Sequence, residues 1–596
     1  MARGRSGNAR SGDDKSALEF ELEHGIPQHD DPFIQKYMSG RQALIEQEKK
    51  QRHDHVFKQT MTPLAKQAAK IMEAVRRKEL QSVWTSDFEQ SLADKNGGNL
   101  YPGMMFTLAR DRMETTELWK MIERMPKGAL LHAHLDAMVD IDWLIDQILN
   151  EPGLCLQTLE PLSDETARES ALIYIRYYPD SVLSKLTGKN SSSSSKNNSI
   201  WTRHYDPNTP ISLREAQRTF PEHDRTFKKW LASRCTITSE ESLAHHHGPD
   251  AIWRKFQSCF LTINQMLFYE PIFRRALRRM LEQLVADGIT YIDFRAAFRF
   301  QWRATGQTEP CKDDTDNHDG TSADCFFKTF GEIISEFQKQ DDEAQSQQHK
   351  FHSARMIWTN IRADDTRTQA RHMQRCIHMK QKYPHLVSGF DFVGQEDRGR
   401  TLADLTPLVF WFRKQCATAG VEIPFFFHAG ECLGDGDATD NNLFDAILLG
   451  TRRLGHAYSL ARHPLLTDMV RDKRILVESC PISNEVLRLA SSIRAHSLPA
   501  LLARGVPCSL NNDDPAILGH GRNGLTHDFA QAYMAWDNLG LEGLAVMAEN
   551  SLRWAAVVDQ NPGDWAKAIS EGYMGKTVKA KLLRQWRSEF EKWFAQ

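Results

Sequence analysis

Residues 422–515 contain four short apolar runs, and each run leads into polar residues that can do chemistry. The runs read PFFFHAGE at 424–431, LGH at 454–456, ILVESCPIS at 475–483 and VPCSLNNDDP at 506–515. A short apolar run bounded by turn residues is typical of a buried strand in a parallel sheet. Because each run delivers its polar groups at its carboxyl end, the stretch predicts the mouth of a parallel α/β barrel.

Four apolar runs upstream supply the remaining strands of this predicted barrel. They lie at 128–136, 288–294, 355–358 and 387–394. Helical stretches, such as 404–419, separate the later strands. Strands that alternate with helices in this way predict an α/β fold, a (β/α)8 TIM barrel.

The segments outside these runs divide the chain into three parts. Residues 1–16 are polar and predicted to be a disordered tail, 17–120 a helical N-terminal extension, and 121–596 the barrel domain. The barrel has a predicted insertion at about 150–245, because a serine-rich linker at 191–198 cannot build a core. In the extension, one helical face is predicted to carry Leu64, Ala68, Ile71, Met72 and Val75. The sequence leaves open whether the extension covers the barrel or pairs with a second copy in a homodimer.

Composition argues against several classes of protein. The chain has 596 residues, a net charge of −3, 41% hydrophobic residues and 26% charged residues, which is ordinary for a soluble globular protein. Near-neutral charge gives no reason to expect nucleic-acid or membrane binding, and no window reaches the roughly 20 apolar residues of a membrane span. The ten cysteines lack a ligand spacing, and no apolar signal segment follows Met1. We therefore expect free thiols and a cytoplasmic protein.

A metal site is the first chemical prediction. His132 and His134 end the first strand and share one face, because side chains alternate along a strand. His428 and Asp513 end two other strands and complete a set of three imidazoles and one carboxylate, which suits zinc. An H-x-H pair alone is more often incidental, but its combination with His428 and Asp513 is much more specific.

Three further polar groups have both a functional and a structural interpretation. Glu431 follows His428 by three residues and can act as a general acid and base, or it caps a following helix. His456 follows Gly455, which permits close approach of another group, or it is a satisfied histidine of the barrel rim. Of the adjacent Asp513 and Asp514, one can bind the metal and the other the substrate, or both lie in a solvated turn.

Taken together, these stretches resemble the adenosine deaminase family, and most closely its adenosine-deaminase-related growth factor subgroup. The motifs that carry the resemblance are MPKGALLHAHLD at 125–136, GFDFVGQED at 389–397, HAGE at 428–431, GH at 455–456, CPISNEVL at 480–487 and SLNNDDP at 509–515. The resemblance extends from about residue 125 to the end of the chain and includes an insertion after the first strand.

The resemblance implies zinc-dependent hydrolytic deamination of adenosine or 2′-deoxyadenosine to inosine or 2′-deoxyinosine, with release of ammonia. The residues implied to hold one zinc ion per chain are His132, His134, His428 and Asp513. Glu431 is implied to give a proton to the purine ring, and His456 to orient the attacking water or take a proton from it. The residues implied to bind the purine nucleoside are Asp514 and Gly394 at the purine, and Asp136 and Trp253 at the ribose.

Two other functions remain open at this point. An adenine nucleotide or an N6-modified adenine nucleoside would undergo the same ring chemistry. A binding protein without catalysis would require the loss of a ligand or of the acid, and the sequence retains both. Gln395 stands where a histidine is common in the subgroup, and the subgroup is typically secreted, so substrate preference and any extracellular role are left open.

Overall fold

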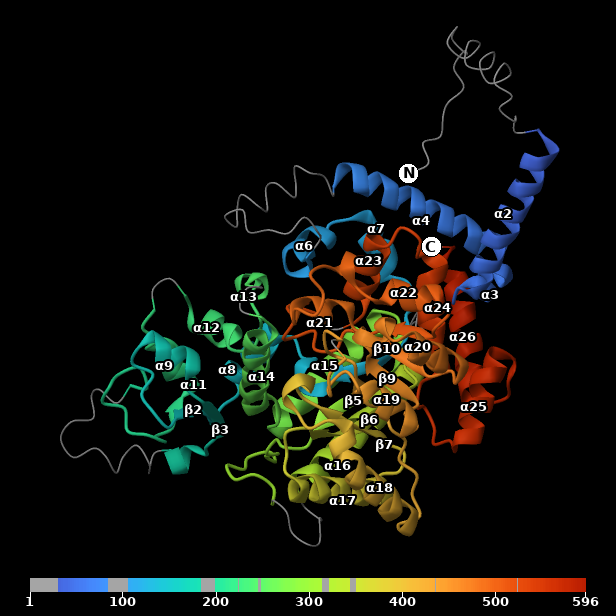
Figure 1. Cartoon of the computed structure of the whole chain (residues 1–596). Helices are drawn as coiled ribbons and strands as arrows, with labels where there is room; N and C mark the ends of the chain where they lie inside the picture. The colour runs from blue at the N-terminus through green and yellow to red at the C-terminus, as the bar shows by residue number, and fades with distance from the viewer. Residues whose placement is uncertain are drawn as a thin grey trace.

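The computed structural model describes residues 30–83, 105–183, 199–222, 225–244, 248–312, 321–343, 350–434, 436–522 and 524–595 (Figure 1). The predicted tail at 1–16 lies outside these residues. Among them, no helix combines the length and the apolar character needed to cross a membrane.

The strands of the barrel are all parallel and form two half-barrels. The first half has the order β1 (Gly128–His134), β5 (Ile289–Ala297), β6 (Ser353–Ile361) and β7 (Val387–Val393). The second half consists of β8 (His428–Ala429), β9 (Arg453–His456), β10 (Leu476–Ser479) and β11 (Cys508–Leu510). Parallel bridges between Ala133 and Asp513 and between Phe390 and Phe425 join the halves at both seams. The predicted (β/α)8 barrel is therefore confirmed.

Helices connect and cover these strands. They are α14 (Gly248–Leu267), α15 (Glu270–Ala286), α16 (Ser322–Glu343), α17 (Thr366–Lys382), α18 (Leu402–Thr418), α19 (Asn442–Leu448), α20 (Pro464–Asp472), α21 (Pro481–Val486), α22 (Leu498–Ala503), α23 (Thr526–Ala535), α24 (Gly540–Arg553), α25 (Pro562–Glu571) and α26 (Val578–Trp593). Short 3-10 turns include η4 (Glu396–Arg398), η5 (Tyr458–Arg462), η6 (Ile493–Ala495) and η7 (Gly572–Met574). In α15, the buried Phe273, Leu277, Leu281 and Leu284 recur at helical spacing, which turns one face of the helix to the barrel.

The connection from β1 to β5 contains a small antiparallel sheet. After η1 (Leu135–Ala137) come α8 (Ile141–Asn150), β2 (Leu154–Thr158), α9 (Glu165–Ser170), β3 (Ile173–Tyr177), β4 (Ile211–Ser212), α11 (Leu213–Arg218), α12 (Phe227–Ser233) and α13 (Ser239–Leu243). β2 pairs with β3 on one side and β4 on the other. In the same connection, the rings of Trp201, Phe227 and Trp230 pack against one another, edge to face or tilted. Figure 1 shows β2, β3, α9 and α11 to one side of the barrel.

The described part of the N-terminal extension is helical. It consists of α2 (Pro32–Gln51), α3 (His55–Thr60), α4 (Pro63–Ser82), α6 (Phe106–Met113) and α7 (Glu117–Glu123). The predicted apolar face of α4 is partly wrong, because Leu64 and Ile71 are 43% and 50% exposed. The buried face of α4 instead includes Arg76 and Glu79. Both side chains have hydrogen-bond partners that compensate their burial: Arg76 donates to the Tyr533 carbonyl, and Glu79 accepts from the Leu118 N–H. Apolar spacing alone missed these two polar anchors.

Candidate active site

The barrel closes where β1 meets the residues that follow β11, and this contact places His132 and His134 next to Asp513. The backbone N–H of Asp513 donates to the His132 carbonyl over 3.2 Å, and the N–H of His134 donates to the Asp513 carbonyl over 3.0 Å. Asp513 has a left-handed φ of 57°, an uncommon backbone conformation for a non-glycine residue. The side chains of His132, His134 and Asp513 therefore converge where the barrel closes.

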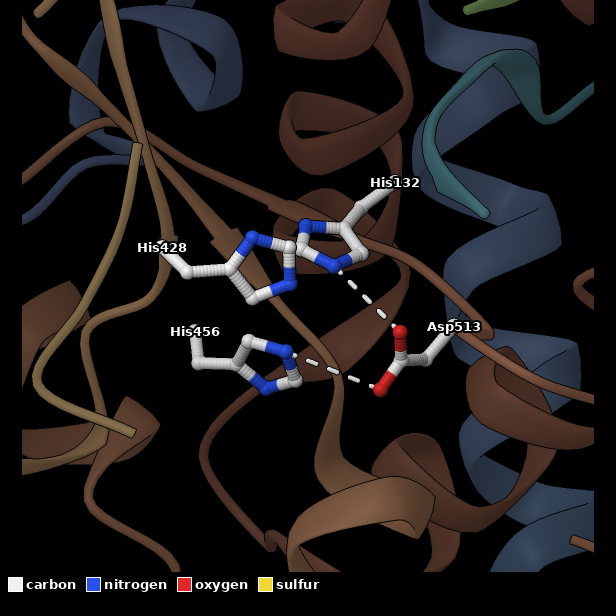
Figure 2. A group of neighbouring side chains, drawn as sticks. All are labelled: His132, His428, His456 and Asp513. Carbon is white, nitrogen blue, oxygen red and sulfur yellow. Dashed lines mark ion pairs between the residues drawn. The ribbon is translucent and has the colours of Figure 1, made fainter. Parts of the chain in front are cut away.

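The four predicted metal ligands lie close together, and Figure 2 shows three of them, His132, His428 and Asp513, beside His456. Asp513 Oδ1 is 3.3 Å from His132 Nε2 and 3.4 Å from His134 Nε2. The ring of His428 lies 4.5 Å from that of His132 and 5.5 Å from that of His134, between centroids. His456 belongs to the same compact group, since ligand atoms of His132, His428, His456 and Asp513 all lie within 4.8 Å of one another.

Carboxylates behind two of the histidines fix the direction in which their rings can bind. His132 Nδ1 lies 2.8 Å from Glu478 Oε2, and His428 Nδ1 lies 2.6 Å from Asp391 Oδ2. An ionised carboxylate only accepts hydrogen bonds, so each Nδ1 carries the proton and each Nε2 turns a lone pair to the site. This arrangement is typical of metal-binding histidines.

Two buried arginines hold these carboxylates ionised. Arg295 donates to Asp391 over 2.9 Å and to Glu478 over 2.7 Å, while Arg453 donates to Glu478 and, over 2.9 Å, to Asp293. Burial raises the pKa of Glu478, but Arg295 and Arg453 together outweigh it, so its pKa lies well below the usual range. For Asp391, burial is likewise outweighed by His428 and Arg295, which lower its pKa.

The residues present fit a metal ion. His132 Nε2 and Asp513 Oδ1 are buried, and neither has a hydrogen-bond partner among the described residues. Because the proton of His132 is on Nδ1, a nitrogen lone pair faces a carboxylate oxygen at 3.3 Å, and a cation between them would relieve the repulsion. Imidazole nitrogens with one carboxylate oxygen are donors that zinc prefers.

Glu431 follows β8 and points its carboxylate into the same group. Oε1 lies 3.5 Å from His456 Nε2, and the side chain is buried. The backbone N–H of Glu431 donates to Glu396 over 2.6 Å, which fixes the turn after the strand. Burial, reinforced by the charge of Asp513, raises the pKa of Glu431 well above its ordinary value. The capping alternative is wrong within the described residues, because the next helix, α19, begins after Asn441.

His456 ends β9 in a strained backbone conformation with φ of 59°. Its Nε2 lies 3.6 Å from Asp513 Oδ2, and its Nδ1 lies 3.1 Å from the side-chain amide of Asn484. The preceding Gly455 is required here, because a Cβ at that position would lie 2.9 Å from the His132 ring. The predicted close approach at Gly455 is therefore present, and it brings two imidazoles together.

The four residues predicted to bind substrate lie in four separate segments of the chain. Asp514 is buried next to Asp513, and burial followed by the charge of Asp513 raises its pKa. Asp136 lies in η1, and burial raises its pKa. Gly394 directly follows β7 and has a φ of 100°, a conformation suited to glycine. Trp253 is buried on α14 against Phe256, with ring centroids 5.0 Å apart, and no described ring contact joins it to the histidines.

Comparison with known proteins identifies the family. The sequence profile of the adenosine deaminase family matches residues 235–570. The chain belongs to the adenosine deaminase family. It is 31% identical to adenosine deaminase 2-A of Danio rerio over 482 residues, covering 80% of this chain and 84% of that protein. It is 29% identical to adenosine deaminase 2 of Sus scrofa, covering 80% and 83% of the two chains. It is 28% identical to adenosine deaminase of Lutzomyia longipalpis, covering 81% and 80%. The chain is accordingly a hydrolase that catalyses the deamination of a purine compound.

Sequence reasoning missed the groups that support the site of this adenosine deaminase family member. The carboxylates of Asp391 and Glu478 orient two histidines. The guanidinium groups of Arg295 and Arg453 compensate the negative charge of these carboxylates. The signal was present, because a charged residue inside an otherwise apolar barrel strand must find a buried partner. The partners lie on strands far apart in the sequence, so the pairs are evident only in the fold.

The support of His456 leads to a prediction about acid stability. His496 lies behind Asn484, and its Nδ1 accepts a hydrogen bond of 3.0 Å from the backbone N–H of Leu498. Burial lowers the pKa of His496 from 6.5 to about 3. The unfolded chain therefore binds this proton more readily than the folded chain does. The contribution of neutral His496 to the free energy of unfolding is complete above pH 6.5. This contribution declines as the pH falls from 6.5 toward 3.

At pH 5 this single histidine is expected to cost about 2 kcal/mol of folding free energy relative to pH 7.5. Denaturant unfolding of the wild type and of His496→Gln at both pH values measures the effect. The variant should lose less stability on acidification than the wild type, by about that amount. Equal losses in the two proteins would contradict the prediction.

Proposed function

We propose that this protein catalyses the zinc-dependent hydrolytic deamination of adenosine or 2′-deoxyadenosine, giving inosine or 2′-deoxyinosine and ammonia. The observation that carries the proposal is the convergence of His132, His134, His428 and Asp513 beside the buried carboxyl group of Glu431. Membership of the adenosine deaminase family supports it.

The metal would be held by His132, His134, His428 and Asp513. When bound, zinc supplies Lewis-acid activation of water at neutral pH. Glu478 and Asp391 keep the Nε2 atoms of His132 and His428 free for this role, because they accept the Nδ1 protons. The protein thus contributes a set of ligands that is already oriented before any ion binds.

Glu431 would supply the acid. The amino-bearing carbon of an aromatic purine resists addition of water, and protonation of the neighbouring ring nitrogen withdraws electron density from it. Burial and the nearby charge of Asp513 favour the protonated form of Glu431, which is the form that can donate. The water oxygen then bonds to the carbon and the water gives up one proton. The amino group takes up a proton, the carbon–nitrogen bond breaks, and ammonia leaves.

Other residues would position the substrate. Asp514 is proposed to accept a hydrogen bond from the purine, and Gly394 to donate its backbone N–H to it. Asp136, two residues after His134 in the chain, is proposed to contact the ribose. The role of Trp253 at the ribose stays a prediction from the resemblance.

A substrate panel tests the proposed function and the dependence on metal. Absorbance and the released amine (ammonia, or methylamine from N6-methyladenosine) are followed with adenosine, 2′-deoxyadenosine, AMP and N6-methyladenosine, with and without a chelator. We expect turnover of the two unmodified nucleosides, loss of turnover with the chelator, and recovery when zinc is added.

Two outcomes would contradict the proposal. Zinc-loaded protein that releases neither ammonia nor methylamine from these compounds would exclude deamination of this substrate class. Faster turnover of AMP or N6-methyladenosine than of adenosine would replace the proposed substrate with the alternative one.

A further inference from the structure

We propose that Asn484 and His496 are positioning residues that hold neutral His456 with its proton on Nε2. In this state His456 donates a hydrogen bond into the site and has no free nitrogen there to accept a proton. The inference rests on the proposed function, and it assigns to His456 the orienting role rather than the role of a base.

The argument begins at a backbone amide whose direction cannot change. The N–H of Leu498, the first residue of α22, points at His496 Nδ1 over 3.0 Å. A backbone N–H only donates, so His496 Nδ1 must be the accepting, unprotonated nitrogen. The proton of neutral His496 is therefore on Nε2.

This proton determines which way the Asn484 amide lies. His496 Nε2 is 2.9 Å from Asn484 Oδ1, and an N–H requires an oxygen there. The two ends of an asparagine amide are normally assigned from their partners, and here the fixed partner is His496. The Asn484 NH₂ group consequently faces His456 Nδ1 at 3.1 Å.

The same reasoning carries over to His456. Because Asn484 donates to Nδ1, that nitrogen is unprotonated, and neutral His456 has its proton on Nε2. Nε2–H points between Glu431 Oε1 at 3.5 Å and Asp513 Oδ2 at 3.6 Å. Uptake of a second proton is possible only on Nδ1, where it would face the N–H of Asn484.

The three histidines of the compact group are thereby sorted into two kinds. Carboxylates stand behind His132 and His428 and turn Nε2 lone pairs to the site. An amide donor stands behind His456 and turns an N–H to it. By distance alone, His456 belongs with the proposed metal ligands. Its hydrogen bond from Asn484 instead makes His456 a donor, directed at the oxygen of the attacking water.

Burial protects this relay from exchange with solvent. The exposed fractions of Asn484, His496 and His456 are 0%, 6% and 2%. Water therefore has little access to substitute for a partner or to reverse a hydrogen bond. Tyr458 and Trp536 flank the His496 ring at 5.3 Å and 6.2 Å between centroids, which restricts its rotation.

Replacement of Asn484 by aspartate reverses the relay with little change in shape. A carboxylate accepts from both rings, so the proton of His456 moves to Nδ1 and Nε2 becomes an acceptor. We expect kcat for adenosine to fall about 100-fold, the range seen when one transition-state hydrogen-bond donor is lost. KM and zinc content should stay near the wild-type values, because the ligands and substrate contacts are unchanged.

The matched control is Asn550→Asp. Asn550 is also a buried amide, and it donates over 3.0 Å to the carbonyl of Cys508, at the opposite end of its strand from Asp513. This variant introduces the same buried carboxylate without touching His456. It should keep the wild-type kcat even if its stability falls. A comparable loss of kcat in Asn550→Asp would show that buried charge, and not the relay, causes the effect.

The tautomer itself is measured by ¹H–¹⁵N correlation spectroscopy of zinc-loaded protein labelled at histidine nitrogens. Signals of His456 are those that disappear in His456→Gln. We expect a protonated Nε2 and a bare Nδ1 in the wild type, and the reverse in Asn484→Asp. A proton on Nδ1 of the wild type, or wild-type kcat in Asn484→Asp, would overturn the proposal.

The spectroscopic result needs no turnover and no variant at Asn484, so it decides the inference even if that variant does not fold. It also separates the two proposals. Absence of ammonia release from the wild type counts against the proposed function, whereas the position of the His456 proton decides the relay.

Discussion

The Glu431→Gln variant is expected to lose turnover of adenosine by about 1,000-fold, as is typical when a general acid is removed. Glutamine has nearly the same shape but no proton to transfer at this position. The structure favours this outcome because Glu431 is buried near Asp513, and both effects hold its carboxyl group in the protonated form. Glu431 is not among the proposed ligands, so zinc content should remain at one ion per chain.

Steady-state kinetics and elemental analysis of the same preparation measure both parts of this result. Glu485→Gln is the matched control, because burial raises the pKa of Glu485 to about 8, while its side chain accepts hydrogen bonds from the Phe106 N–H and from Gln531 instead of from a histidine of the site. This control should keep its activity. Turnover near the wild-type rate in Glu431→Gln would remove Glu431 from the mechanism.

The second large effect is expected from Glu478→Gln. Glu478 accepts hydrogen bonds from His132, Arg295 and Arg453, and its side chain has no exposure to solvent. Without the negative charge of Glu478, the positive charges of Arg295 and Arg453 are less compensated in the barrel interior. Breaking a buried ion pair typically lowers the free energy of unfolding by about 3–5 kcal/mol. It also weakens the orientation of His132, for which we expect about 10–100-fold lower zinc affinity.

Chemical unfolding of metal-free protein gives the stability term, and competition with a chromogenic chelator gives the affinity. The control is Glu117→Gln, since Glu117 pairs with Lys120 at the surface, where it is 70% exposed, and such pairs contribute less than about 1 kcal/mol. A Glu478→Gln protein as stable as this control, with unchanged zinc affinity, would show that the interior network has no supporting role.

The barrel was predictable because its strands are buried on both faces and therefore read as apolar runs. One strand shows the limit of that signal. The run at 424–427 predicts a full strand, but β8 contains only His428–Ala429. Pro424 has no N–H to donate to a ladder, and Phe425 pairs with Phe390 through a single bridge.

The site was predictable to the extent that its residues follow strands directly. His132, His428 and Asp513 could be found because the carboxyl ends of parallel strands meet at one mouth. The direction of each imidazole could not be found, since it depends on Asp391, Glu478 and Asn484, which approach from other strands and helices. The homodimer, the cytoplasmic location and the domain limits stay predictions.

The bridge between Ala133 and Asp513 links the first strand of the barrel to the residues that follow its last strand. The same backbone contact that seals the cylinder also assembles the ligand set, so a nascent or truncated chain lacking β11 has no metal centre to fill. An ion that binds only the sealed form stabilises it by mass action. A bound metal ion would then hold the first and the last strand of the barrel together, so removal of the metal is expected to weaken this seam.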